Sequence, residues 1–540
     1  MTSFTIQQFQ GSIPRLADHL GTKGTAAEAI DCKLESGNLD SFREPKFIRD
    51  LGEATRTVLH QCCWHDFKGC VDVAYGSVNC KEIFVTGLRE YPVQISVNDD
   101  CEVTETRLGM PCPTRAPSVV VGDVSDTTDE DYEGRTYSYQ YVSSLGWRSQ
   151  LSPGSRAQNL KDGQICIISG WTKPDPSWDV VSVAIYRSVT GHQSGREPGN
   201  TPDTVWMLVA EIDIDEVAYT DTNRNEDLFT AVEEDVVLPP PEGLRGITWV
   251  ESSNCLFGFV GNRIYASENH NYYNWPYYYD LDDNVCGIVE SGGAIYVATD
   301  GHPYILNAVA DCKHAGCRDI LRLPGAFPMV GCGNQRMAAC SVGAVYPSHK
   351  GLVILTGRKA PKYLTLELYT DEDWQILMPQ TVTPIEVGGK LYVFAQNGAF
   401  CMSLAFGAEK DSIVQSHTSL SDRGVTDAFV TRQGDFYIVK DHKLYQWDRG
   451  EQIRPHVFTS VGLLTPSPIG WASGRLDFQY GKENVKIVCD GRTVLDREII
   501  STREFRLPMH AIGTETYCTI SGTGRVKRFS IATSVSELNK

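Results

Sequence analysis

The stretch CLFGF-VGN-RIYAS, residues 255–267, decides the fold. Two strand-like runs rich in Leu, Phe, Ile and Tyr flank a turn built on Gly261 and Asn262, which is the pattern of a β-hairpin. Four hairpins of this kind follow: AIYVA-TDGHP-YILN from Ala294, AVYP-SHKG-LVIL from Ala344, LYVFA-QNG-AFCMS from Leu391 and FYIV-KDHK-LYQWD from Phe436. A single hairpin cannot bury its apolar face, so this series predicts the stacked blades of a β-propeller.

The regions around the hairpins also have the character of strands. Tyr137, Tyr139 and Tyr141 alternate with polar residues, and VSVAIY and WMLVAEI follow, a pattern typical of a small β-sandwich. Three consecutive prolines from Pro239 then predict a stiff linker. We therefore expect an all-β chain, a β-propeller with an inserted β-sandwich. The expected segments are an N-terminal arm with the first propeller-associated strands (1–115), the inserted sandwich (116–238), the propeller core (239–459) and a C-terminal β segment that completes the propeller or caps it (460–540).

Composition excludes several classes of protein. The 540 residues carry a net charge of −19, which argues against a protein that grips nucleic acid by its phosphates. There is no apolar run long enough to span a bilayer, and the first residues, MTSFTIQQFQGSIPRL, lack the pattern of a secretory signal. The 17 cysteines are odd in number and scattered, so we expect mostly reduced, buried thiols in a protein made in a cytosol.

Two groups of Cys and His residues have the residue types of a zinc site. They are Cys62, Cys63, His65 and Cys70, and Cys312, His314 and Cys317. Neither group has the paired spacing of a zinc knuckle, so buried thiols are the favoured interpretation and no metal or other cofactor is predicted.

Acidic residues concentrate in the predicted sandwich, with eleven between Asp203 and Asp235. Solvated loops are the ordinary interpretation of such runs. The sharper one is an acidic rim or channel lining, for which the candidates are Asp213, Asp215, Glu216, Glu233, Glu234 and Asp235. The segment EIDIDEVAYTD lacks the glycine of a calcium-binding loop and alternates as a one-sided strand does.

No enzymatic motif stands out. P-loop, HExxH and GxSxG patterns are absent, and the many carboxylates single out no acid/base pair. The aromatic run NYYNWPYYYDLDD, residues 271–283, could form a stacking platform for sugars or bases. The favoured alternative is a loop pinned to the propeller by its rings, with Pro276 fixing the turn.

Several blocks resemble a family of phage virion proteins. In the run from Gly258 to Leu281 the resemblance is carried by a hairpin followed by Ser267-Glu268 and then by Trp275-Pro276. The N-terminal block PRLADHLGTKGTAAEAIDCKLESGNLDSFREP, the block YSYQYVSSLGWRSQLSPGS and the C-terminal block ISGTGRVKRFSIATSVSEL agree in order. The chain is thus similar to the tail nozzle, or tail tubular, proteins of short-tailed phages, propellers with a fibronectin-type-III-like insert. It departs from them in its many cysteines and in HNYYN, where the family more often places a proline.

The resemblance implies a non-enzymatic structural protein of the phage tail. It implies a homo-oligomeric ring, with six copies expected, around a channel for DNA ejection. Adaptor proteins and fibres or spikes would be its partners, without membrane anchoring. The chain would be made in the host cytoplasm and end in the virion. An acidic wall would repel phosphates, so genomic DNA would pass without specific binding. The alternatives are a propeller adhesin or a glycan-degrading tail component that contacts the host surface.

Overall fold

The computed structural model describes residues 3–15, 21–22, 24–76, 82–122, 132–161, 164–189, 205–224, 227–232, 236–308, 318–331, 333–404 and 414–538. Strands are the dominant regular elements, and the described residues contain one short α-helix, α1 (Asp371–Ile376). No helix in this part of the chain is long and apolar enough to cross a bilayer. The all-β prediction is confirmed.

The chain forms two compact units, which we describe separately. Unit 1 comprises residues 1–71, 283–308 and 319–540, and unit 2 comprises residues 72–282 and 309–318.

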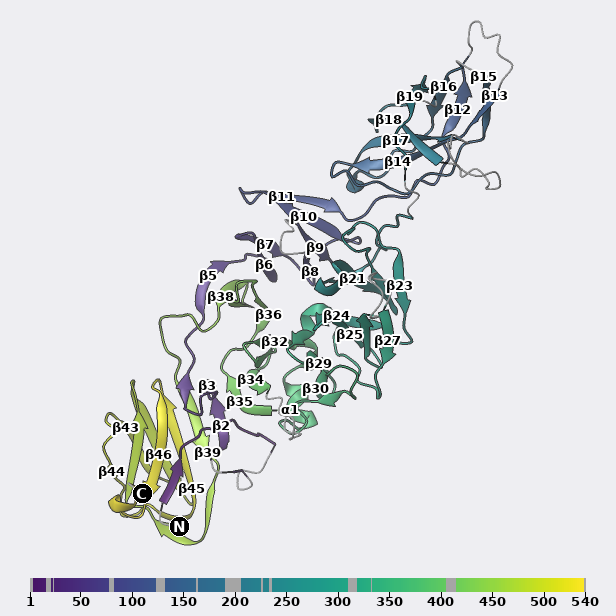
Figure 1. The fold of residues 1–540 in the computed structure, drawn as a ribbon. Helices are drawn as coiled ribbons and strands as arrows, with labels where there is room; N and C mark the ends of the chain where they lie inside the picture. Colours follow the sequence, from purple (N-terminus) through teal and green to yellow (C-terminus); the bar gives the residue numbers. More distant parts are fainter. Residues whose placement is uncertain are drawn as a thin grey trace. The chain divides into compact units, whose positions relative to one another are not determined.

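Unit 1 contains four sets of four antiparallel strands that lie side by side (Figure 1), and the third set belongs to a larger sheet that continues into the C-terminal strands. Their strands are β24 (Val285–Ser291), β25 (Ala294–Thr299), β26 (Tyr304–Ala308) and β27 (Arg318–Arg322); β28 (Ala338–Cys340), β29 (Gly343–Ser348), β30 (Gly351–Leu355) and β31 (Lys362–Tyr363); β32 (Thr383–Val387), β33 (Lys390–Phe394), β34 (Ala399–Leu404) and β35 (Val414–Leu420); and β36 (Val425–Val430), β37 (Phe436–Lys440), β38 (Lys443–Gln446) and β5 (Lys46–Asp50).

Four of the five predicted hairpins are the middle strands of these sheets: β25–β26, β29–β30, β33–β34 and β37–β38. Consecutive sheets share apolar cores. Tyr296 and Tyr346 belong to the core that joins the first sheet to the second. Val345 and Phe400 join the second to the third, and Phe394 and Ile438 the third to the fourth. Four-stranded sheets packed in chain order are the blades of a β-propeller, which confirms the predicted fold.

The fourth blade is completed by an N-terminal strand. β5 pairs with β38, with Asp50 opposite Lys443 and Lys46 opposite Gln446. A strand from far away in the sequence thus satisfies the open edge of the last blade, which would otherwise present unpaired backbone groups.

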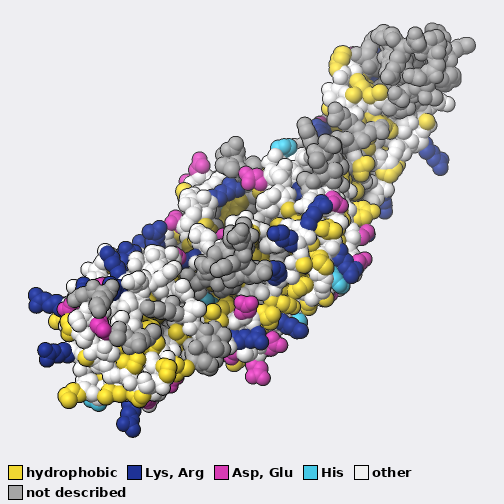
Figure 2. Space-filling model, turned by 60° about the horizontal axis from the view of Figure 1, so that its bottom comes forward, with side chains coloured by type: hydrophobic (Ala, Val, Ile, Leu, Met, Phe, Trp, Pro, Cys, Tyr) yellow, Lys and Arg dark blue, Asp and Glu magenta, His cyan; other side chains and the backbone are white. Residues whose placement is uncertain are grey.

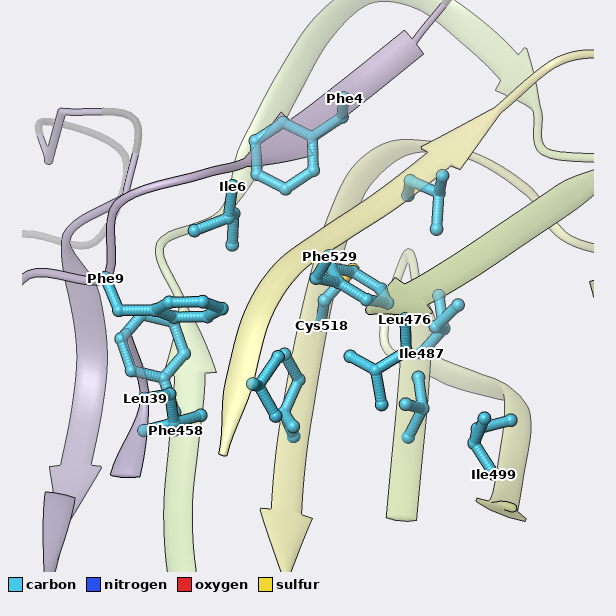
Figure 3. Packing of buried hydrophobic residues seen from close by; sticks show 14 of the residues in the cluster. Phe4, Ile6, Phe9, Leu39, Phe458, Leu476, Ile487, Ile499, Cys518 and Phe529 are labelled. Atoms are coloured by element: carbon cyan, nitrogen blue, oxygen red, sulfur yellow. The ribbon is translucent and has the colours of Figure 1, made fainter. Parts of the chain in front are cut away.

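The C-terminal residues form a separate sandwich core with N-terminal strands. One sheet runs β1 (Ser3–Ile6), β46 (Val526–Ala532), β41 (Ser473–Phe478) and β44 (Phe505–Arg506). The facing strands are β39 (His456–Ser460), β40 (Leu463–Gly470), β45 (Ile512–Gly522), β42 (Glu483–Cys489) and β43 (Arg492–Ile499), with β2 (Ala26–Ile30) beside β39. Figure 3 shows Phe4 and Ile6 of β1 in the same cluster as Phe529, and Phe9 against Phe458, with ring centroids 5.0 Å apart. Nothing in the local sequence pattern indicated that residues 3–6 belong to this core.

Unit 2 contains two further four-stranded blades. They are β8 (Asp72–Tyr75), β9 (Glu82–Thr86), β10 (Val93–Val97) and β11 (Val103–Arg107), and β20 (Arg245–Val250), β21 (Cys255–Val260), β22 (Arg263–Ala266) and β23 (Tyr277–Asp280). The fifth predicted hairpin is β21–β22. Phe84 and Leu108 of the first blade share a core with Leu256 and Trp275 of the second.

Unit 2 also holds two sheets that face each other across an apolar core. One is β12 (Ser118–Val121), β16 (Cys166–Ser169) and β19 (Ala218–Asp221), and the other is β14 (Tyr137–Ser143), β17 (Val180–Val189) and β18 (Val205–Asp213). Tyr139 and Ile185 of one sheet and Ile168 of the other are buried in this core. We call this part the insert sandwich; that it is an inserted domain, its relation to fibronectin-type-III domains and the predicted domain boundaries all remain predictions.

Candidate functional site

The motif that carries the family resemblance lies in the blade β20–β23. Ser267 follows β22 and is fully buried. Its amide donates to the carbonyl of Leu256 at 2.8 Å, and its hydroxyl accepts the amide of Leu256 at 2.9 Å. The N–H and the C=O of Leu256 in β21 therefore both have a hydrogen-bond partner, although β22 ends one residue before Ser267. Buried backbone groups need such partners. Ser267 therefore extends the pairing of the hairpin.

Glu268 closes the turn that leads out of the hairpin. Its Oε2 accepts from Nδ2 of Asn271 at 3.1 Å and from Nδ2 of Asn274 at 3.0 Å. Its amide donates to the carbonyl of Asn274 at 2.8 Å. Hydrogen bonds to an ionised acceptor are stronger than neutral ones, so this carboxylate holds residues 268–274 in one conformation. These amides belong to HNYYN, where the chain departs from the family pattern.

Trp275 fixes the other end of the turn. Its side chain is 3% exposed and packs with Phe84, Leu108 and Leu256. Its Nε1 donates to the carbonyl of Tyr272 at 2.8 Å. The half-buried Pro276 comes directly before β23, where its fixed φ suits an extended chain.

The aromatic run is folded onto its own unit. Tyr272 makes edge contacts with Phe84 and Trp249, with ring centroids 5.3 and 5.5 Å apart. Tyr273 stacks on Trp147 at 5.1 Å and 20°. Among the aromatic side chains of this run only Tyr278 is strongly exposed, at 58%. The arrangement is that of a pinned loop, since the rings that a platform would offer to a ligand contact other rings.

The pinned loop also joins the blade to the insert sandwich. Trp147 lies in the loop after β14, so the Tyr273–Trp147 stack crosses from blade to sandwich. The amide of Trp275 donates to the carbonyl of Leu238 at 2.7 Å, and the amide of Leu238 donates to Oδ1 of Asn274 at 2.9 Å. Leu238 is the residue before the three prolines, so the motif holds the exit of the sandwich segment. We call residues 267–276 together with Leu238 the clamp.

The entry of the sandwich segment runs beside its exit. The Arg107 guanidinium at the end of β11 lies 3.6 Å from the ring centroid of Trp178 and pairs with Glu242 at 3.0 Å. Gly109 lies against the prolines with a φ of +103°, and a Cβ there would stand 2.6 Å from Cδ of Pro240. Only glycine fits this place without strain.

Substituting Gly109 with alanine should therefore lower the free energy of unfolding of unit 2 by roughly 2–4 kcal/mol. Chemical denaturation followed by tryptophan fluorescence measures the change. Gly146→Ala is the matched control, because Gly146 also has a positive φ, of +78°, but nothing lies near its Cβ position. Equal effects of the two substitutions would show that the close packing on Pro240 contributes nothing.

The acidic candidates fall into two groups. Asp213 ends β18, and its Oδ1 accepts the amide of Asp215 at 2.8 Å. Asp215 pairs with Lys173, and the amide of Glu216 donates to the carbonyl of Asp213 at 3.1 Å. These three therefore form an exposed turn between β18 and β19. Glu233, Glu234 and Asp235 lie outside the described residues.

The cysteine candidates do not come together as a metal centre within the described part of the chain, where no group of three or more His, Cys, Asp or Glu side chains could hold a metal ion. Cys62 and Cys70 are exposed free thiols, whereas Cys63 is disulfide-bonded, as is Cys101. Burial lowers the pKa of His65. Eleven described cysteines are free and eight of them are buried, but the two bonded ones depart from the expectation of reduced thiols. Cys312, His314 and Cys317 lie outside the described residues.

One buried polar chain in unit 1 had no counterpart in the sequence pattern. His417 Nδ1 lies 3.0 Å from the Ser12 hydroxyl, and Nε2 lies 2.8 Å from the Tyr369 hydroxyl. A cavity of about 300 Å³ opens beside Ser12 and His417. Burial lowers the pKa of His417 to about 4, so the imidazole is neutral at pH 7. Because the three residues are far apart in the sequence, spacing could not have brought them together.

This shift makes stability depend on pH. A folded-state pKa of about 4, below the unfolded value of 6.5, means that the unfolded chain binds the proton first. The free energy of unfolding should therefore fall as pH drops from 6.5 towards 4, by roughly 3 kcal/mol from this group. Denaturation of the wild type and of His417→Gln across this range measures it, and parallel profiles for the two proteins would contradict the prediction.

Comparisons with known proteins give no family. No family model and no curated protein matches the chain. Among solved structures, the chain is similar to the β-propeller domain of Cps50 (Swd1) from Myceliophteria thermophila, at 11% identity and a TM-score of 0.30, over 50% of this chain and 81% of that one. It is also similar to BamB from Moraxella catarrhalis, at 12% identity and a TM-score of 0.27, over 62% of this chain and 99% of that one. A third similar structure is Sqt1 from Saccharomyces cerevisiae, at 10% identity and a TM-score of 0.28, over 75% of this chain and 98% of that one. These TM-scores are too low to support any inference, and the propeller assignment rests on strand pairing and packing.

Proposed function

We propose that this chain is a non-enzymatic structural component of a phage tail, a propeller scaffold assembled as a ring of copies that forms a nozzle for DNA. The observation that carries the proposal is the clamp. The family-like motif makes internal hydrogen bonds and packing contacts that fix the insert sandwich to a blade. Its residues are Ser267, Glu268, Trp275 and Pro276. A part that must keep its shape under load needs such a junction, whereas a ligand site needs side chains directed outward.

The all-β architecture supports the same proposal. Blades leave few unpaired edges, and the described helix is short, so little of the structure can unwind locally. The net charge of −19 suits a wall past which DNA moves without binding.

Location in the particle tests the proposal. The full chain carrying a C-terminal affinity tag would be expressed during phage infection and labelled with gold on purified particles. Labels confined to the tail are expected. Particles without label, when the tagged chain is present in the lysate, would overturn the proposal. Labels on the fibres would favour the adhesin instead.

A further inference from the structure

The outward side of the sheet β12–β16–β19 is exposed and carries no charge. Val120 lies opposite Ile167, which lies opposite Thr220, and the exposed fractions of the two apolar side chains are 61% and 38%. The neighbouring row on this side is Ser118, Ser169 and Ala218. We call these six residues the insert face. A flat sheet face of β-branched and small side chains is suited to packing against another protein surface.

Carboxylates flank the insert face. Asp215 and Glu216 are exposed in the turn that leads into β19, directly before the exposed Val217. Residues 116–238 contain 21 acidic and 8 basic residues, a net charge of −13. Two insert faces would repel each other, so a symmetric contact between them is disfavoured. A partner for this face needs an apolar centre with positive charges around it.

The C-terminal sandwich of the same chain offers that chemistry. Residues 460–540 contain 11 basic and 8 acidic residues, whereas each of the other three predicted segments is net negative. Figure 2 shows Lys and Arg side chains gathered over this sandwich at the lower left. Ile500 is 76% exposed among Arg497, Arg503 and Arg506. We call these four residues the cationic edge.

The cationic edge includes residues from the outer strands of both sheets of the sandwich. Arg497 belongs to β43 and lies 5.5 Å from the ring centroid of Phe505 in β44, so the outer strands of the two sheets meet there. Ile500 and Arg503 lie in the loop between these strands.

The charges of the arginines in the cationic edge are not neutralised by a described carboxylate. They form no ion pair with any described residue, whereas the neighbouring Glu498 and Glu504 are paired with Lys482 and Arg475 at 3.2 and 3.9 Å. Cations on outer strands also discourage edge-to-edge pairing. That role leaves Ile500 unexplained, since an exposed isoleucine works against it.

We propose that the insert face of one copy binds the cationic edge of a second copy, head to tail. Ile500 packs on Val120 and Ile167, and Arg503 and Arg506 approach Asp215 and Glu216. This contact rests on the proposed function in naming the partner of each copy in the ring, but it is measured on the purified chain, so its failure leaves the labelling experiment untouched. A head-to-tail contact closes into a ring when its rotation divides a full turn.

Sedimentation equilibrium of the full chain tests the contact. We expect self-association whose constant falls about tenfold or more between 50 and 500 mM salt. Arg503→Glu/Arg506→Glu should weaken it about tenfold, and so should Asp215→Lys/Glu216→Lys. The variant with all four changes should return to within about threefold of the wild type, because the charges are again complementary. Val120→Arg should weaken association through the apolar centre.

Matched controls keep the outcome decisive. Arg492→Glu/Lys527→Glu makes the same charge change on exposed residues of the same sandwich that are not among the four of the cationic edge, one at the start of β43 and one in β46, and Val103→Arg alters an exposed valine of β11. Neither should change the association constant beyond about threefold, and circular dichroism should show every variant folded. A monomer at all concentrations, or association that the charge reversals leave unchanged, would overturn the proposal. So would equal effects of the test and control variants.

Discussion

Substituting Asp221 with alanine is expected to destabilise the insert sandwich by about 3–5 kcal/mol, because it removes the carboxylate that is paired with a buried arginine. Arg187 Nη1 lies 2.8 Å from Asp221 Oδ2, and both side chains are fully buried. The Tyr137 hydroxyl donates to the same oxygen at 2.8 Å. Burial raises the pKa of this phenol, with the Asp221 charge adding to the shift, so the tyrosine stays a donor at neutral pH. Thermal unfolding followed by circular dichroism measures the loss.

The double variant Arg187→Met/Asp221→Leu separates the cost of breaking the buried pair from the net contribution of the pair to stability. Replacing a buried ion pair by apolar side chains is often close to neutral, so the double variant should be more stable than Asp221→Ala. Asp280→Ala is the exposed control: it removes an ion pair with Arg263 on the surface of the neighbouring blade and should leave the melting temperature unchanged. A double variant no more stable than Asp221→Ala would show that the pair itself holds the sandwich together.

Substituting Trp275 with alanine is expected to cost about 3–5 kcal/mol in the free energy of unfolding of unit 2. The substitution leaves a cavity among Phe84, Leu108 and Leu256 and removes the bond from the indole to the Tyr272 carbonyl. Denaturation with urea gives the change in stability. In addition, the Tyr273–Trp147 stack should loosen, because Trp275 anchors the same turn.

Trp275→Ala is unsuited to testing the adhesin alternative. Loss of host binding in Trp275→Ala would reflect damage to the clamp, since only 3% of this side chain is exposed. Tyr278→Ala is the discriminating variant, because its ring is exposed and its loss should change stability by less than about 0.5 kcal/mol. Host-cell binding by the purified chain that disappears in Tyr278→Ala would favour the adhesin over the structural role.

The blade hairpins could be predicted because their signal is local. The period-two pattern and the turn residues of β21–β22 or β33–β34 lie within about a dozen residues. The pairing of β5 with β38, and of Ser3 with Ala532, could not be predicted, because no local pattern specifies a partner hundreds of residues away. Such pairings are decided by which open sheet edge remains once the local hairpins have formed.

The candidate site shows the same limit. The family resemblance identified four residues of the motif, Ser267, Glu268, Trp275 and Pro276. Their structural role depends on contacts with other residues, which the resemblance did not identify. Asn274 binds both Glu268 and Leu238, and Gly109 makes room for the prolines. The acidic candidates Asp213, Asp215 and Glu216 were found from charge density alone, which locates carboxylates without indicating what faces them.

The clamp is the central claim, and hydrogen–deuterium exchange of the full chain tests it most directly. The amides of Glu268, Trp275 and Leu238 donate to carbonyls or an amide oxygen within the clamp, so they should exchange as slowly as those of β21 and β22. Exchange of these three amides at the rate of exposed loops, while the blade strands remain protected, would contradict it. The motif would then be a mobile loop, and the structural role proposed for the chain would lose its support.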